Sequence, residues 1–145
     1  MTQRMAINLL AALCLIMAGY LVASTYLLGV EGDRVWEEAT RTYVEEYHQW
    51  LSESPGSGWA RVEALAAGPE RERIERLRSE AQVPSEWRYG GGEYRLMLQA
   101  AGKAIVEADY HLQTALVSEE VQEIYLLEKV LQGIKVTRVL GGSRQ

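Results

Sequence analysis

The feature that most constrains this chain is an uncharged, largely apolar run of 25 residues near its N-terminus, Ala6 to Val30. At about 1.5 Å of rise per residue, a helix of this length exceeds the roughly 30 Å of a bilayer's hydrocarbon core, so it can cross with some tilt. A cleaved signal peptide is the alternative, because Val22-Ala23-Ser24 resembles a cleavage site. The apolar run continues beyond that triplet, however. We therefore expect an uncleaved transmembrane helix over residues 6–30, after a short tail of residues 1–5.

The charges that flank this segment predict its orientation. Of the 15 Lys and Arg residues only Arg4 precedes it, whereas the acidic residues Glu31 and Asp33 follow it directly. The positive-inside rule then leaves the N-terminus in the cytoplasm and the rest of the chain outside it, as a single-pass membrane protein. Gly19 and Ala23 form a pair of small residues four apart, which would let a second transmembrane helix approach closely.

The part of the chain after Val30 carries 14 basic and 20 acidic residues, a net charge of −6. Phosphate binding relies on clustered positive charge, so this balance argues against a nucleic-acid partner. The lipid bilayer and other membrane proteins, including a second copy of the chain, are the partners that the sequence favours.

Residues 31–53 have the pattern of an amphipathic helix that connects the membrane to a domain. Aromatic side chains recur at helical spacing and form a stripe along one face. The stripe can pack on the protein's own domain or on a partner helix, and we take its members as candidate partner-binding residues. They are Trp36, Tyr43, Tyr47 and Trp50.

A linker, residues 54–58 with the sequence Ser-Pro-Gly-Ser-Gly, follows this helix, and the domain proper is expected over residues 59–145. The domain begins with two predicted helices, from Trp59 to Ala67 and from Pro69 to about Gln82. Gly90-Gly91-Gly92 then indicates a flexible loop around Trp87 and Tyr89.

The stretch from Glu93 to Leu116 fits either one helix or two strands. Its apolar residues keep a spacing of three and four, but the second half also alternates apolar with polar residues, and Ala100-Ala-Gly-Lys103 suits a hairpin turn. The C-terminal residues favour the two-strand interpretation of this stretch. Ser118 and Gly133 bound a predicted helix, and the strand-like run Ile134–Leu140 after it needs a partner strand.

The expected fold class is therefore α+β, with helices on a small antiparallel sheet in the order helix–strand–strand–helix–strand. An all-α domain is the alternative.

This layout resembles the M-type and O-type inner-membrane assembly-platform proteins of type II secretion and type IV pilus systems. The residues that carry the resemblance are Arg61–Ala67 through Leu77–Ala81, Leu126–Lys129 and Gly133–Val139. The resemblance implies a non-enzymatic scaffold in a bacterial inner membrane that dimerises and binds sister membrane proteins.

No motif in the sequence specifies a reaction or a cofactor. Glu45 and His48 form an E-x-x-H pair, which is half of what a di-iron bundle uses, and the other histidine, His111, lacks the matching spacing. We therefore expect no enzyme, no cofactor and no metal site. The predicted function is a single-pass membrane scaffold. The alternative is a membrane-tethered ligand-binding or sensor module with its site at Trp87, Tyr89 and the three glycines.

Overall fold

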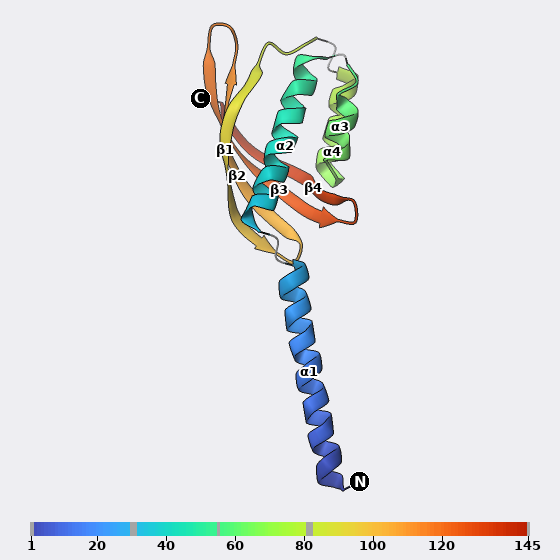
Figure 1. Cartoon of the computed structure of the whole chain (residues 1–145). Helices are drawn as coiled ribbons and strands as arrows, with labels where there is room; N and C mark the ends of the chain where they lie inside the picture. The colour runs from blue at the N-terminus through green and yellow to red at the C-terminus, as the bar shows by residue number, and fades with distance from the viewer. Residues whose placement is uncertain (1, 30–31, 55, 81–82, 145) are drawn as a thin grey trace. The chain divides into compact units, whose positions relative to one another are not determined.

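The structure is a computed structural model that describes residues 2–29, 32–54, 56–80 and 83–144, with side chains described for all of these except 23–29 and 142–144. The chain divides into two compact units, Met1–Glu31 and Gly32–Gln145. Figure 1 shows their secondary structure.

The first unit is one helix, α1, Gln3–Gly29. Its described side chains are exposed on every side, so it has no apolar partner within its own unit. Within the described residues, α1 alone has the length and apolar composition that crossing a bilayer requires, and a signal sequence near an N-terminus would meet the same two criteria. Val30, the expected end of the membrane segment, lies outside the described residues.

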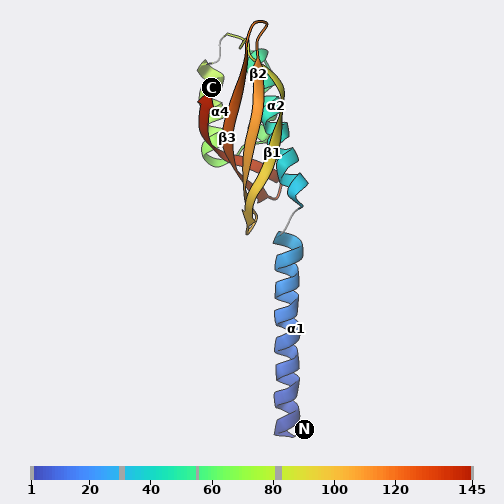
Figure 2. The same cartoon turned by 90° about the vertical axis from the view of Figure 1, so that its left-hand side faces the viewer.

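The second unit combines helices with one antiparallel sheet, so the α+β prediction is confirmed and the all-α alternative is wrong. The helices lie on one side of the sheet (Figure 1), and Figure 2 looks onto the opposite side, where no helix lies in front of the strands. The sheet is a meander in which neighbouring strands follow one another in the chain. The elements are α2 Asp33–Ser52, α3 Trp59–Ala64, α4 Gly68–Glu80, β1 Arg88–Ala100, β2 Lys103–Gln113, β3 Ser118–Val130 and β4 Gly133–Arg144.

Strand β2 shows why the stretch from Glu93 to Leu116 is not a helix. Its side chains alternate between the core and the outer face, which is the period of a strand with one buried side. The expected hairpin at residues 100–103 is confirmed, because Ala100 and Lys103 are paired across β1 and β2. Ala101 and Gly102 both have positive φ, 51° and 74°, as a tight two-residue hairpin loop requires.

The helix expected between Ser118 and Gly133 is wrong, because this segment forms β3. β3 pairs with β2 on one side and with β4 on the other. Without a strand here, the backbone groups of β2 and β4 that face this gap would have no partner, a cost that outweighs the local preference for a helix. Gly133 does not end a helix; it lies next to the β3–β4 turn, where its φ of 115° suits glycine.

The glycine-rich loop is a second correction, because Gly90, Gly91 and Gly92 lie inside β1. The pairing of β1 with β2 shifts register between Tyr89 and Gly92, so the glycines accommodate a bulge. The strand begins at Arg88, directly after Trp87.

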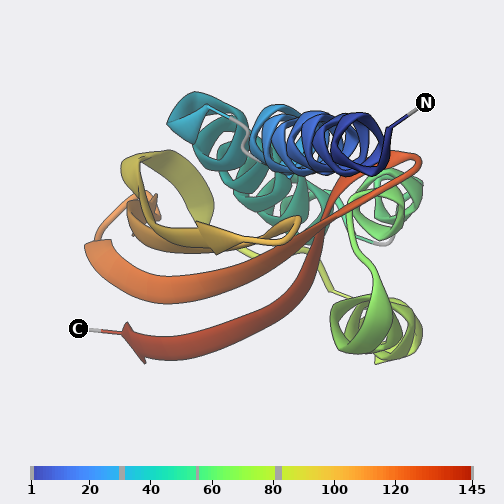
Figure 3. The ribbon, with the colours of Figure 1, turned by 90° about the horizontal axis from the view of Figure 1, so that it is seen from below.

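The boundary between the two compact units lies before α2. The chain divides between Glu31 and Gly32, not at the expected linker of residues 54–58, and α2 belongs to the second unit. Its buried residues pack in the same cluster as the inner side chains of the sheet. Figure 3 shows the sheet curving beside α2. Pro55 of the linker and residues 81–82, the expected end of the second domain helix, lie outside the described residues.

The segment between α3 and α4 protects the outer edge of β4. The Ala67 backbone N–H donates to the Val136 carbonyl at 2.9 Å, and the Val136 N–H donates to the Leu65 carbonyl at 2.9 Å. These two bonds form a short parallel bridge at Ala66, which pairs part of an edge that would otherwise be open to another chain. The same contacts hold α4 close to the inner face of the sheet.

Candidate functional site

A cavity of about 360 Å³ lies between α2, α4 and the inner face of the sheet. Its volume falls within the roughly 300–1,000 Å³ that is usual for small-molecule sites. We call it the tyrosine cavity, because tyrosine rings make up much of its wall. Its aromatic lining residues are Tyr43, Tyr47, Trp87, Tyr110 and Tyr125, and its ionisable lining residues besides the tyrosines are His48, Arg73 and Glu123.

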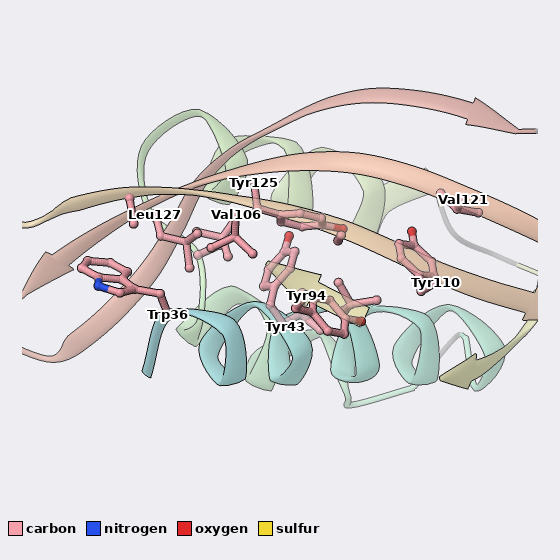
Figure 4. Packing of buried hydrophobic residues seen from close by; sticks show 14 of the residues in the cluster. Trp36, Tyr43, Tyr94, Val106, Tyr110, Val121, Tyr125 and Leu127 are labelled. Carbon is pink, nitrogen blue, oxygen red and sulfur yellow. The ribbon is translucent and has the colours of Figure 1, made fainter. Parts of the chain in front are cut away.

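The aromatic stripe of α2 supplies one wall of this region. Trp36, Tyr43 and Trp50 are 0%, 1% and 2% exposed, and Tyr47 is half-buried. Figure 4 shows Trp36 and Tyr43 in the layer between α2 and the strands, together with Tyr110 and Tyr125. In the structure, therefore, the stripe packs on the protein's own domain. Trp36, Tyr43 and Trp50 are buried, so they offer no surface to a partner helix.

Glu70, at the start of α4, connects Tyr43 to Arg73, and Arg73 in turn contacts Tyr47. Its side chain is 2% exposed, and its Oε1 accepts from the Tyr43 hydroxyl at 2.7 Å and from Arg73 Nε and Nη2 at 2.9 and 2.5 Å. Arg73 Nη1 also donates to the Tyr47 hydroxyl at 3.1 Å, and the guanidinium lies 5.1 Å from the centre of that ring. A buried carboxylate is costly unless it is paired and hydrogen-bonded, and Glu70 meets both conditions.

Glu123, on β3, joins the two tyrosines of the sheet. Its Oε1 accepts from the Tyr110 hydroxyl at 2.7 Å and its Oε2 accepts from the Tyr125 hydroxyl at 2.6 Å. His48 Nε2 lies 3.2 Å from the Tyr110 oxygen. Since the only hydroxyl proton of Tyr110 is donated to Glu123, His48 is the donor in this contact and carries its proton on Nε2.

Burial keeps these tyrosines in the neutral, hydrogen-bond-donating form. Burial first, and then the Glu70 carboxylate, raise the pKa of Tyr43 well above its ordinary value of 10.0. Burial and then Glu123 raise the pKa of Tyr110 in the same direction, and burial followed by Tyr110 and Glu123 raises the pKa of Tyr125. A hydroxyl with a raised pKa stays protonated near neutral pH, so each of the three remains a donor to its carboxylate.

Gly92 allows Tyr110 to take its place in the cavity wall. The two residues are paired across β1 and β2, and a Cβ on Gly92 would lie 2.4 Å from the Tyr110 Cβ, closer than real atoms approach. The glycine run therefore brings the backbone of β1 against β2. Gly92 leaves room for the Tyr110 side chain, and the glycine run does not form the expected loop over a ligand.

The predicted ligand site at Trp87 and Tyr89 overlaps the cavity in part. Trp87 lines it, whereas the Tyr89 hydroxyl pairs with that of Tyr94 at 2.8 Å, and the Tyr89 ring lies 5.9 Å from that of Tyr110. Glu70, Arg73 and Glu123 were not among the residues expected from the sequence. Glu70 and Arg73 have the pattern of a solvated charged helix face, and Glu123 faces the core only because residues 118–130 form a strand.

The two histidines lie apart, and only His48 belongs to the tyrosine cavity. His48 is buried beside Tyr110, His111 is exposed on β2, and within the described residues no three His, Cys, Asp or Glu side chains are placed to hold a metal ion. Gly19 lies on the exposed surface of α1 with open space around it, and the Ala23 side chain lies outside the described residues.

The tyrosine cavity can thus present aromatic faces, hydroxyls held in fixed directions and one carboxylate to a molecule that enters it. The hydrogen bonds described above hold these groups in place before any ligand arrives, which lowers the entropic cost of binding. Among protein-family models, curated proteins and solved structures, none matches this chain.

Proposed function

We propose that this protein is a membrane-anchored module that binds a small molecule in the tyrosine cavity. The observation that carries the proposal is the cavity itself: about 360 Å³ with aromatic walls and a few convergent polar groups. A concave, largely aromatic pocket with a small number of placed polar groups is the usual form of a small-molecule site. The scaffold function expected from the sequence relied on the α2 stripe, whose rings are mostly buried in the protein's own core. The resemblance to assembly-platform proteins stays a prediction.

A matched pair of neighbouring substitutions in β4 tests the binding function. Val139 lines the cavity, whereas Leu140 is 44% exposed and pairs with Ile124, on the other face of the sheet. Val139→Phe should fill part of the cavity, and Leu140→Phe should leave it open. Binding to the folded state stabilises a protein by about 2.7 kcal/mol at a ligand concentration one hundred times the Kd, so a true ligand raises the melting temperature.

The measurement is a thermal-shift screen of the full chain in detergent micelles against a panel of small amines, carboxylic acids, sugars and aromatic fragments. We expect at least one class to raise the melting temperature of the unmodified chain and of Leu140→Phe, but not of folded Val139→Phe. No shift from any class, or the same shift in both variants, would overturn the proposal.

We also propose that α1 anchors the chain, with the N-terminus in the cytoplasm and the second unit outside it. The support is the apolar length of α1 together with Arg4 before it and Asp33 after it. Cys14 is the only cysteine, and Leu131 is exposed at the β3–β4 turn. A chain with Cys14→Ser and Leu131→Cys should react with a membrane-impermeant maleimide in right-side-out vesicles without lysis. Labelling that appears only after lysis would mean that the second unit lies on the cytoplasmic side.

A further inference from the structure

The charges in the wall of the tyrosine cavity do not cancel. Arg73 and Glu123 are the lining residues with a formal charge when His48 is counted as neutral. Arg73 is already paired with the buried Glu70 at 2.5 Å, so these two charges compensate each other. Glu123 accepts from two tyrosine hydroxyls, which are neutral donors, and among the described side chains it has no ion-pair partner. The cavity therefore carries one uncompensated negative charge.

The Glu123 carboxylate is held ready to accept a further donor. An ionised carboxylate offers about four lone-pair positions, of which Tyr110 and Tyr125 occupy two, one on each oxygen. Because burial raises the pKa of both hydroxyls, they stay protonated and keep the carboxylate fixed. Glu123 is partly exposed and lines the cavity, so its remaining lone pairs are open to a molecule inside.

The aromatic wall matches the same kind of ligand. The faces of tyrosine and tryptophan rings are electron-rich and attract cations within about 6 Å. The site already shows this preference, because the Arg73 guanidinium lies 5.1 Å from the centre of the Tyr47 ring. A metal ion fits less well than an organic cation. A hard metal needs several oxygen ligands, and within the described residues no three acidic, histidine or cysteine side chains are placed to hold one.

We propose that the tyrosine cavity binds a small organic ammonium ion, with its charge against Glu123 and its carbon groups on the aromatic rings. This inference rests on the proposed ligand-binding function and specifies the class of ligand. The volume of about 360 Å³ suits a molecule the size of choline or a short alkylamine.

The test compares charged and uncharged probes of the same shape on the full chain in non-ionic detergent. Isothermal titration uses choline, butylammonium and the uncharged isostere of choline in which a tert-butyl group replaces the trimethylammonium group. We expect a cation to bind at least about ten times more tightly than the isostere, since losing about 1.4 kcal/mol of charge interaction weakens binding tenfold.

Two variants assign the effect to the cavity. Glu123→Gln keeps the size and one acceptor oxygen but removes the charge, so it should weaken cation binding by about tenfold or more and leave the isostere unchanged. Trp87→Leu removes an aromatic face and should weaken cation binding by about threefold. Glu107→Gln, on the outer face of the sheet, is the charge-matched control and should bind the cation as the unmodified chain does. A circular dichroism spectrum and a melting curve confirm that each variant is folded.

The outcomes separate this inference from the function on which it rests. Equal binding of choline and its isostere, or a folded Glu123→Gln chain with unchanged cation affinity, would overturn the ammonium assignment and leave the cavity as a site for another ligand class. Thermal shifts from carboxylic acids or sugars, with none from amines, would have the same meaning. Only the absence of any ligand that responds to Val139→Phe would overturn both.

Discussion

The two faces of the four-stranded sheet use the same strands in opposite ways. On the face covered by helices, β2 places Ala104, Val106, Ala108, Tyr110 and Leu112 in the core, each 4% exposed or less. On the bare face the alternate residues of the same strand are exposed or half-buried, and most of them are charged or polar. Arg95 bridges two of them, Glu107 at 3.0 Å and Asp109 at 3.4 Å.

The difference shows where the stability and the specific chemistry of this unit lie. The covered face holds the aromatic cluster and the two carboxylate networks, around the buried Glu70 and the partly exposed Glu123, in which removal of one partner leaves a polar group without a bond. The ion pairs of the bare face are solvated, and such pairs contribute about 0–1 kcal/mol. The bare face also has apolar residues, since Leu98, Ile105 and Leu126 line a second cavity at one end of the sheet.

The largest expected effect is the difference in stability between removing a leucine side chain from the covered face and removing one from the bare face. Leu127 is 2% exposed on the covered face, and Leu98 is 60% exposed on the bare face. Leu127→Ala should lower the free energy of unfolding by about 2–5 kcal/mol, because it removes buried methyl groups and leaves a space that its neighbours fill incompletely. Leu98→Ala should change it by about 0.5 kcal/mol or less.

Urea unfolding in detergent micelles, followed by tryptophan fluorescence, measures both values. All four tryptophans, Trp36, Trp50, Trp59 and Trp87, belong to the second unit, so the signal reports that unit alone. Equal losses from the two substitutions would mean that the bare face is also buried, for instance against a second copy of the chain.

An effect that is smaller per residue should appear at alkaline pH and should come from the covered face. The pKa values of Tyr43, Tyr110 and Tyr125 are raised above the ordinary 10.0 by burial. In the unfolded chain these tyrosines lose their protons near pH 10, whereas in the folded protein they retain them. Stability is therefore fully present below pH 10 and falls as the pH rises beyond it, by about 1.4 kcal/mol per pH unit for each tyrosine.

Unfolding curves at a series of alkaline pH values check this slope. Tyr125→Phe should reduce the fall in stability by about 1.4 kcal/mol per pH unit, which is the contribution of one tyrosine. Tyr20→Phe should leave it unchanged, because Tyr20 lies in α1, outside the unit whose unfolding is measured. A stability that stays constant well above pH 10, or a slope that Tyr125→Phe does not alter, would contradict the assignment of the pH dependence to the buried hydroxyls.

Part of the site could be predicted from the sequence because it depends on local periodicity. The aromatic stripe of α2 follows from spacing along one helix, and so its four members were identified, although not the surface they pack on. Glu123 could not be identified in this way. In a helix it would lie beside the apolar stripe of Val121, Ile124 and Leu127, and only the strand period turns it to the same side as Tyr125. A polar residue that alternates in step with buried ones is the signal that could have found it.

By itself, the sequence determined the apolar helix at the N-terminus, the amphipathic α2 and the hairpin at residues 100–103, because each depends on residues near one another in the chain. The α+β class was inferred from a longer-range requirement, the need of the strand-like run Ile134–Leu140 for a partner strand. The tertiary structure decided that residues 118–130 form a strand and that α2 packs on the sheet. Both outcomes depend on distant partners: β3 satisfies the backbone groups of β2 and β4, and the inner face of the sheet buries the rings of α2. The tyrosine cavity exists only where these elements meet, since its lining residues include members of α2, α4, β2, β3 and β4.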